Sequence, residues 1–201
     1  RKLMPPCTGQ KEMGVINWFL LIKQSIKSYN SFKKTQDALM VKLNIVLLEP
    51  EIPQNTGNIG RTCLAMGAVL HLVEPMGFSI EDKYLKRAGL DYWKELNVQY
   101  YRNYSDFLTK NPHGQKVLIS KKAMNRCDQF CYESEVYLVF GKESVGLPDE
   151  MLLDKQEFCV RIPMSAHTRS LNLANAVAIL SYEVMRQYSF TGLKTAGEVQ
   201  P

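Results

Sequence analysis

The sequence contains no apolar run that approaches the roughly 20 residues needed to cross a bilayer. Among its 201 residues, the longest apolar run of the N-terminal part is Val15 to Ile22, and Asn17 interrupts it. This run resembles the core of a signal peptide, but no small-residue cleavage site follows it. We therefore expect a cytoplasmic protein with no membrane partner, and a targeting peptide stays open as the alternative.

Cysteine and histidine are too few and too scattered for a disulfide framework or a metal site. The five cysteines are an odd number, and the three histidines stand apart from one another. Cys127 and Cys131 form a CxxxC pair, but no further cysteine or histidine lies close enough in sequence to complete a zinc site. We expect ordinary thiols in a reducing compartment and no bound metal.

Three common cofactor and catalytic motifs are also missing. No GxGxxG is present, which argues against a dinucleotide-binding oxidoreductase. Gly141-Lys142 resembles the end of a phosphate-binding P-loop, but Val136 occupies the position of its leading glycine and Glu143 that of its serine or threonine. No GxSxG supports a hydrolase of the α/β class.

Positive charge is concentrated in one part of the chain. The net charge of +5 at first suggests a nucleic-acid partner. Residues 1–39 contain seven Lys/Arg and two Asp/Glu, whereas residues 40–201 contain eighteen of each sign. The whole excess therefore precedes Met40, and a strand pattern begins directly after that residue. We expect residues 1–39 to be upstream or fused sequence, poorly packed and dispensable, before an electrically neutral folded body.

Short apolar runs alternate with helical patterns over the rest of the chain. Six runs predict strands, namely Leu43–Leu48, Val69–Val73, Val98–Tyr101, Lys116–Ser120, Val136–Phe140 and Phe158–Ile162. Five patterns predict helices, namely Arg61–Met66 (after an Asn58 cap and before Gly67), Ser79–Ala88, Tyr104–Lys110, Asp149–Asp154 and Leu171–Tyr188. The alternation predicts one α/β domain with a mainly parallel sheet and helices on both faces.

Three loops concentrate glycine, proline, asparagine and charge where a parallel sheet usually carries its site, beyond the carboxyl ends of the strands. They are Pro53–Arg61, within a predicted loop from Glu49 to Gly60, then Phe140–Pro148, and Arg161–Ala176. In the first, Asn55 and Arg61 flank a glycine-rich turn at a helix start, which suits an anion. In the second, Glu143 follows Gly141, where backbone can approach a ligand closely.

In the third loop, Ser170 and Asn172 open the last predicted helix. Each polar residue also has a simpler explanation when it is taken alone. Ser170 could be only a helix cap, Asn55 only a turn residue, and Arg61 only a surface charge.

Taken together, the loops resemble the motifs of the SPOUT class of RNA methyltransferases. The stretch from Leu43 to about Gly192 is similar to the tRNA wobble-nucleotide (cytidine or uridine) ribose 2′-O-methyltransferases of the TrmL/YibK type, which leaves residues 193–201 as a short tail after a domain at 40–192. The matching segments are Glu49-Pro-Glu-Ile-Pro-Gln-Asn-Thr-Gly-Asn-Ile, Glu74-Pro-Met-Gly-Phe, Arg87-Ala-Gly-Leu-Asp-Tyr92, Phe140-Gly-x-Glu-x-x-Gly-Leu-Pro148 and Arg161-Ile-Pro-Met.

The resemblance implies a C-terminal deep trefoil knot that holds S-adenosylmethionine in a bent shape. By position, the residues that would bind this cofactor are Ile119, Gly141, Leu147, Ile162, Met164, Ser170 and Leu171. It also implies a homodimer, with the last helix and the first motif helix at the interface, so that Arg61 of one subunit would serve the other. A sulfonium is already an activated methyl donor, so the reaction needs no metal.

The implied reaction is methylation of the ribose 2′-hydroxyl of the wobble nucleotide in the tRNA anticodon loop. The implied catalytic residues are Arg61, Asn55, Glu143, Asn172 and Ser170. Arginine is a poor base because its pKa lies above 12, so we expect Arg61 to position the phosphate and the hydroxyl. Asn55, Glu143 and Asn172 would orient Arg61 and the knot loops. Tyr182 could serve the site, the interface or the core.

Because the body is neutral, RNA binding must come from local basic patches. The candidates are Lys83, Lys86 and Arg87 on one predicted helix, Lys121 and Lys122 after a strand, and Arg169 (with Arg161) beside the third loop. A solvated helix face explains the first cluster equally well.

The chain departs from its relatives at several positions, which leaves RNA preference open. Gly60 replaces an isoleucine, Lys142 a proline, and Val145 an arginine, and the third motif reads Ser170-Leu-Asn-Leu-Ala174. Two alternatives remain: methylation of another tRNA position or of ribosomal RNA, and a non-catalytic relative that only binds RNA or cofactor.

Overall fold

The computed structural model describes residues 40–79 and 93–197. Several predictions concern residues outside these ranges. They are the state of residues 1–39, nearly all of the helix at Ser79–Ala88, and the basic cluster Lys83, Lys86 and Arg87.

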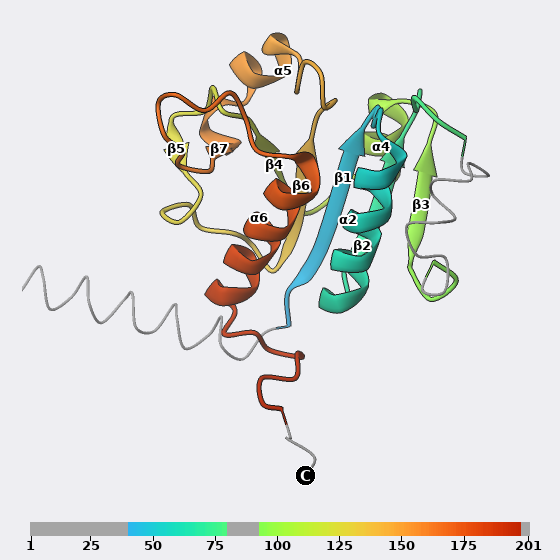
Figure 1. The fold of residues 1–201 in the computed structure, drawn as a ribbon, viewed down its shortest axis with the longest axis vertical. Coiled ribbons are helices and arrows are strands. Elements are labelled where there is room, and N and C mark those ends of the chain that lie inside the picture. Colours follow the sequence, from blue (N-terminus) through green and yellow to red (C-terminus); the bar gives the residue numbers. More distant parts are fainter. Residues whose placement is uncertain (1–39, 80–92, 198–201) are drawn as a thin grey trace, which may run out of the picture. The chain divides into compact units, whose positions relative to one another are not determined.

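A seven-stranded sheet forms the centre of the described part of the chain (Figure 1). Its order is β3-β2-β1-β6-β4-β7-β5, and every neighbouring pair runs parallel. The strands are β1 (Lys42–Leu48), β2 (Val69–Val73), β3 (Val98–Tyr101), β4 (Gln115–Ile119), β5 (Asn125–Arg126), β6 (Glu135–Phe140) and β7 (Cys159–Arg161). The parallel sheet is confirmed, and the six predicted strands are present with ends that differ by one residue at most. Sequence patterning missed β5, because two residues show no period.

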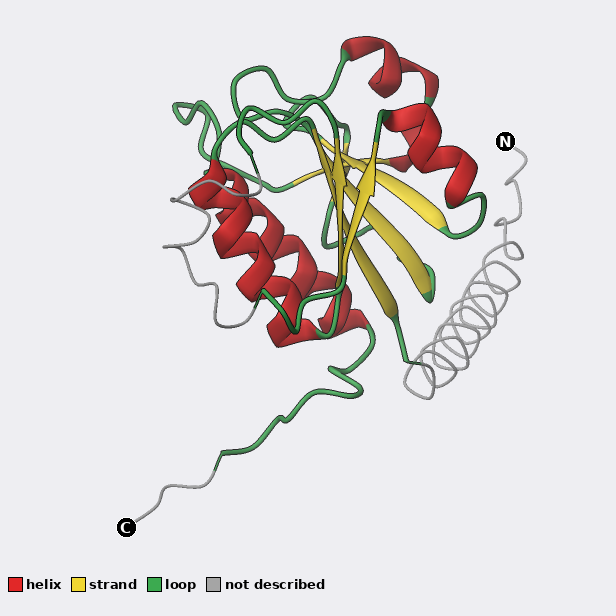
Figure 2. Cartoon of the chain, turned by 90° about the vertical axis from the view of Figure 1, so that its right-hand side faces the viewer, coloured by secondary structure: helices red, strands yellow, loops and turns green. Residues whose placement is uncertain are grey.

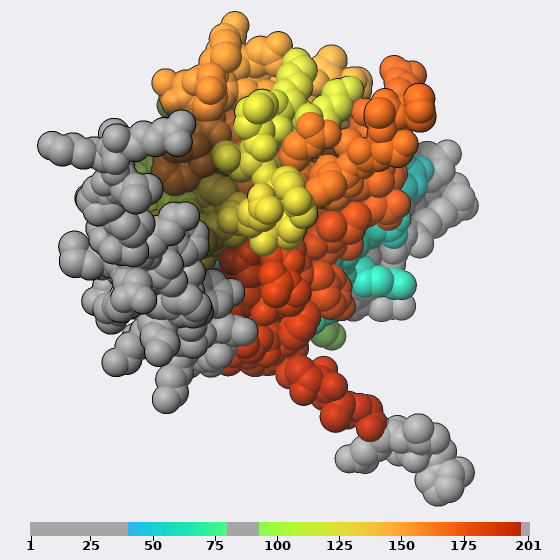
Figure 3. Space-filling view, turned by 90° about the vertical axis from the view of Figure 1, so that its left-hand side faces the viewer, coloured from blue at the N-terminus to red at the C-terminus, as the bar shows by residue number. Residues whose placement is uncertain are grey.

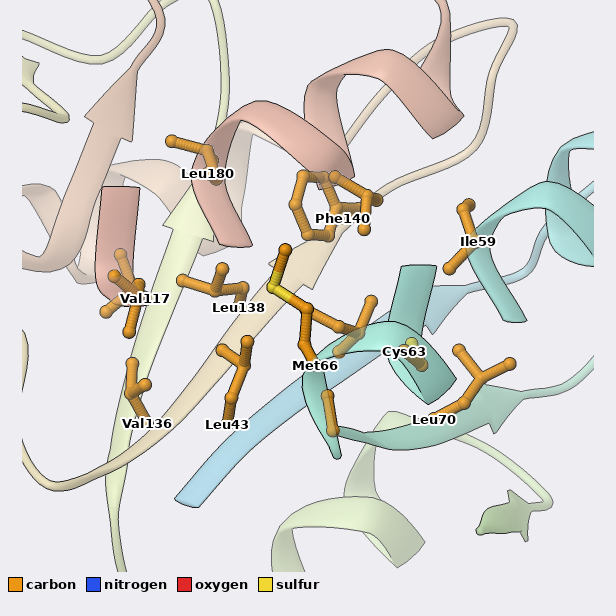
Figure 4. Packing of buried hydrophobic residues seen from close by; sticks show 14 of the residues in the cluster. Leu43, Ile59, Cys63, Met66, Leu70, Val117, Val136, Leu138, Phe140 and Leu180 are labelled. Atoms are coloured by element: carbon orange, nitrogen blue, oxygen red, sulfur yellow. The ribbon is translucent and has the colours of Figure 1, made fainter. Parts of the chain in front are cut away.

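Helices cover both faces of the sheet, as Figure 2 shows. On one face lie α2 (Pro53–Met66) and α6 (Leu173–Gln187), and on the other lie α4 (Tyr104–Lys110) and α5 (Asp149–Asp154), with the short η1 (Gln156–Phe158) after α5. The two-residue period of the strands divides the core accordingly. Leu43 and Leu138 pack in the cluster under α2 and α6 (Figure 4), whereas Val46 and Val139 pack in the cluster under α4 and α5.

The first site loop is largely helical, which corrects the predicted loop from Glu49 to Gly60 and the Asn58 cap. Helix α2 begins at Pro53, with Ile52 in the N-cap position. Proline suits the first turn, because its φ is already helical and an N–H there has no intrahelical partner. Burial of one helix face, including Ile59 and Cys63, then offsets the low helix propensity of the two glycines.

Gly60 lies where two large side chains pack against α2. A Cβ at Gly60 would lie 3.0 Å from the Leu96 side chain and 3.1 Å from the Trp93 ring. Glycine therefore lets these two side chains lie directly against α2, one residue before Arg61. The predicted helix end is confirmed, since Gly67 closes α2 with a φ of +64°.

A buried polar network lies between the sheet and α4. The Asn44 amide donates to the Val136 carbonyl, so its oxygen faces His71 Nε2 at 3.1 Å. An amide oxygen only accepts, so Nε2 carries the proton, and Nδ1 is left to accept from the Tyr101 hydroxyl at 2.8 Å. His71 is thus held neutral with both ring nitrogens satisfied.

This network predicts an acid-sensitive fold. Burial, with a smaller contribution from Lys42, lowers the pKa of His71 from 6.5 to about 4. Between these values the unfolded chain binds a proton that the folded chain does not, so stability falls as the pH drops from 6.5 toward 4. For His71 alone the loss at pH 5 is about 2 kcal/mol. Urea unfolding at pH 7 and pH 5 measures this loss of stability. The His71→Gln variant should lose less stability between the two pH values than the unmodified protein. Equal losses in both would contradict this assignment.

Candidate functional site

The three polar loops meet in one cavity beyond the carboxyl ends of β4, β6 and β7. Its volume is about 390 Å³. All seven residues predicted to bind the cofactor line it, namely Ile119, Gly141, Leu147, Ile162, Met164, Ser170 and Leu171. In Figure 3 the orange chain that leads into α6 lies beside the yellow residues around 125, in keeping with the hydrogen bond between Lys121 and the third loop.

The loop after β6 is folded tightly on itself at Gly141. A Cβ there would lie 2.1 Å from the Gly146 carbonyl carbon and 2.3 Å from the Leu147 nitrogen, so only glycine fits. The Gly146 amide donates to the Lys142 carbonyl at 2.8 Å, and Gly146 itself has a φ of +78°. The backbone, rather than side chains, thus forms part of the cavity wall.

Three of the predicted catalytic residues form one chain of hydrogen bonds across the three loops. The Asn172 amide donates to Asn55 Oδ1 at 2.9 Å, and the Asn55 amide donates to Glu143 Oε1 at 3.0 Å. Asn55 is buried, and all three residues line the cavity. Asn55 therefore joins the second and third loops to the first at this cavity.

The Glu143 carboxylate accepts hydrogen bonds from groups at the start of α2. Besides the Asn55 amide, it accepts from the Glu51 N–H at 2.8 Å and the Ile52 N–H at 3.3 Å. A carboxylate in this position also interacts favourably with the positive end of the helix dipole. Glu143 therefore joins two loops and, with its oxygens engaged, is poorly placed to act as a free base.

Asn172 has a second function as the cap of α6. Its Oδ1 accepts from the Ala174 N–H at 2.9 Å and the Asn175 N–H at 3.4 Å. The suggestion that Ser170 is only a helix cap is therefore wrong, because Asn172 fills that position. Ser170 instead lines the cavity.

Arg61 is the predicted catalytic residue that the structure does not bring to the cavity of its own chain. It lies on the exposed side of α2, six residues beyond Asn55, which is about 9 Å along the helix axis. It is absent from the residues that line the cavity.

Two predicted RNA-binding lysines lie at the rim of the cavity. Lys121 and Lys122 both line it. Lys121 Nζ donates to the Arg169 carbonyl at 3.3 Å, which brings exposed Arg169 to the same rim. Lys122 pairs with Asp149 at 2.5 Å, and both side chains are more than half exposed. Lys121 and Arg169 therefore place positive charge beside the cavity, whereas the charge of Lys122 is balanced by Asp149.

Sequence reasoning missed several residues that line the cavity. They are Ile52, Ser120, Phe140, Lys142, Ser144, Val145, Gly146, Leu173 and Ala176. Most directly neighbour a predicted site residue, so position next to a motif was the available signal.

Residues 40–79 and 93–197 contain no group of His, Cys, Asp and Glu side chains that could hold a metal ion. The four cysteines in these ranges are free thiols. Within the same part of the chain, no helix is long and apolar enough to span a bilayer.

The tight turn at Gly141 predicts that its substitution disables the cavity. Gly141→Ala should weaken binding of S-adenosylmethionine at least about tenfold, because the added methyl meets backbone that can move only by opening the loop. Isothermal titration measures this change. Gly197→Ala, whose added methyl would meet no atom within 4 Å, is the matched control outside the cavity and should bind normally. Normal binding by the Gly141 variant would show that the loop does not form the cofactor site.

The chain is similar to RNA methyltransferases in sequence and in fold. The profile of the SpoU rRNA methylase family matches residues 42–182. A Geobacillus stearothermophilus protein, provisionally named a tRNA (cytidine(34)-2′-O)-methyltransferase, is 46% identical over 154 residues, which make up 75% of this chain and 98% of the relative.

Solved structures agree with the sequence comparison. One, described as giving structural insights into the 2-OH methylation of C/U34 on tRNA, has a TM-score of 0.70 at 39% identity and covers 75% of this chain and 98% of its own. An AdoMet-bound rRNA methyltransferase from Sinorhizobium meliloti has a TM-score of 0.65 at 25% identity, over 75% of this chain and 59% of its own. By both its sequence and its fold, the chain belongs to the SpoU rRNA methylase family.

Proposed function

We propose that this protein transfers a methyl group from S-adenosylmethionine to the ribose 2′-hydroxyl of the wobble nucleotide, position 34, in the tRNA anticodon loop. The observation that carries the proposal is the cavity in which Asn55, Glu143 and Asn172 join the three loops. The names of relatives that are 46% identical and of a solved structure that is 39% identical indicate position 34 as the target.

The lining of the cavity fits the chemistry of this cofactor. Ile119, Leu147, Ile162 and Leu171 offer apolar surface for the faces of an adenine ring, and the turn at Gly141 presents backbone groups to its edges. S-Adenosylmethionine supplies a methyl group already activated by the sulfonium. The methyl group would pass to the 2′-oxygen, the donor would leave as S-adenosylhomocysteine, and the hydroxyl proton would pass by way of the RNA phosphate to water. We propose that no metal takes part, because this donor needs no Lewis acid.

The protein residues then supply positioning. Holding the hydroxyl in line with the methyl carbon and sulfur accounts for most of the required rate enhancement. Lys121, Lys122 and Arg169 at the rim would bind phosphates of the anticodon loop, which makes affinity salt-dependent. Arg61 would hold the target phosphate and hydroxyl, because a guanidinium forms a fork of donors to phosphate and does not give up its proton near neutrality.

We further propose a homodimer in which Arg61 serves the cavity of the partner subunit. Arg61 is exposed and outside the cavity of its own chain. On α6, Ile179 is 43% and Tyr182 55% exposed, which supports an interface there and argues against Tyr182 as a core aromatic. The knot of the SPOUT class belongs to the same proposal, and it is supported by the position of β4 between β6 and β7 and by the contact of Lys121 with the third loop.

Two parts of the proposal concern the whole chain. Residues 40–192 would form the methyltransferase domain, since the family profile matches 42–182, and residues 1–39 would be dispensable. The cytoplasm would be the location, in keeping with a tRNA substrate and free thiols.

A methyl-transfer assay tests the function. The protein is incubated with labelled S-adenosylmethionine and total tRNA, and modified nucleosides are mapped by mass spectrometry. We expect 2′-O-methylation at position 34, reduced at least about 100-fold in Arg61→Ala with cofactor binding unchanged. Arg126→Ala, which removes an exposed arginine paired with Asp128, is the control and should keep full activity.

The assay has clear adverse outcomes. Methylation of a base, or of no RNA, would contradict the proposed function. Methylation of another tRNA position or of ribosomal RNA would change the proposed target but keep the proposed reaction. Full activity of the Arg61 variant would remove Arg61 from the mechanism.

Co-expression of two inactive variants tests the shared site. In a heterodimer of Arg61→Ala and Gly141→Ala, one cavity keeps both an intact loop and an intact partner arginine. Random pairing then restores about a quarter of the normal activity, because half of the dimers carry one complete site out of two. Each variant alone is the control, and a mixture as inactive as either would show that Arg61 acts within its own chain.

A further inference from the structure

The two loops joined by Glu143 are also joined by a second carboxylate, that of Glu51. Glu51 lies between β1 and α2, and Ser144 lies next to Glu143 in the loop after β6. Glu51 Oε2 accepts from the Ser144 N–H at 2.9 Å, and its Oε1 accepts from the Ser144 hydroxyl at 2.9 Å. Glu143 in turn accepts from the Glu51 and Ile52 N–H groups. Each loop therefore contributes a carboxylate that accepts hydrogen bonds from the backbone of the other loop.

An ion pair extends this connection by one residue. Lys142 Nζ lies 2.5 Å from Glu49 Oε2. Glu49 has a φ of +52°, which a residue with a side chain adopts only when its surroundings hold it there. Three consecutive residues, 142 to 144, are thus tied to the segment at 49–52.

The backbone of Glu51 is held from its other side by Gly77. The Gly77 amide donates to the Pro50 carbonyl at 2.9 Å, and a Cβ on Gly77 would come within 2.9 Å of Glu51 Cα. This close packing restricts movement of the Glu51 backbone, from which the carboxylate extends. Its hydrogen bonds from Ser144 lower the pKa of Glu51, so it stays ionised at neutral pH and makes charge-assisted bonds.

Glu51 does not line the cavity, whereas Glu143 and Ser144 do. Any effect of Glu51 on a ligand must therefore pass through Ser144 and the loop that continues to Leu147. That loop reaches into solvent at Val145, whose side chain is 76% exposed.

We propose that Glu51 is a positioning residue of the cofactor site, whose carboxylate holds Ser144 and thereby keeps the Gly141–Leu147 loop in the shape that binds S-adenosylmethionine. The proposal rests on the proposed function and assigns Glu51 a role that the predicted catalytic set does not contain. It places Glu51 in cofactor binding rather than in the transfer step.

The backbone geometry allows Glu51 to be tested apart from Glu143. Glu143 binds the N–H of residue 51, and this group persists whatever side chain stands there. Glu51→Ala therefore removes both bonds to Ser144 and leaves those of Glu143 in place. Glu51→Gln can still accept from one Ser144 group, and Ser144→Ala removes only the hydroxyl bond.

Titration and kinetics give the first readout. We expect Glu51→Ala to raise the Kd and KM for S-adenosylmethionine about tenfold, with kcat and the KM for tRNA changed less than about twofold. Glu51→Gln and Ser144→Ala should show smaller increases. Glu150→Ala, which removes an exposed carboxylate on α5, is the control and should behave as the unmodified protein. An unchanged Kd in Glu51→Ala, or an equal rise in the control, would overturn the inference.

Hydrogen exchange gives a second readout that needs no cofactor. Amides of residues 141–147 should exchange faster in Glu51→Ala, while those of β1 and β6 keep their protection. Unchanged exchange in the loop would overturn the inference even if the enzyme is active. If the unmodified protein bound no S-adenosylmethionine, the proposed function would fail, and the exchange experiment would still decide whether Glu51 holds the loop.

Discussion

The arrangement of the site depends on one carboxylate, that of Glu143, placed against the first turn of α2. It accepts two backbone N–H groups and the Asn55 amide, which in turn meets Asn172. The start of a helix leaves N–H groups without intrahelical partners, and an ionised carboxylate satisfies them while it interacts with the helix dipole. One side chain thus joins the loop after β6 to α2, and through Asn55 to the start of α6.

The sheet makes this meeting possible. Because β1 and β6 are parallel neighbours, the loops that leave their carboxyl ends emerge side by side. The two clusters of apolar side chains, one on each face, hold these strands in register and keep the loop ends at fixed separation. Polar contacts such as those of Glu51 with Ser144 then need to set only the shape of the loops.

The cavity lining was predictable because its residues lie within or next to the recognised motifs. Ile119, Gly141 and Leu171 sit at or just beyond strand ends or before a helix, where position along the chain determines position at the edge of the sheet. The position of Arg61 relative to the cavity could not be predicted in this way. Its motif identified the residue, but only the structure shows it exposed and outside its own cavity.

By itself, the sequence determined the alternation of strands and helices, the parallel sheet and part of the cavity lining, because apolar period and motif position are local properties. Only the tertiary structure decided that α2 begins at Pro53, that Asn172 caps α6 and meets Asn55, and that Glu51 holds Ser144. These features join residues up to 117 positions apart, or depend on burial against the sheet. Their free energy comes from neighbours that the fold supplies, and no local pattern encodes those neighbours.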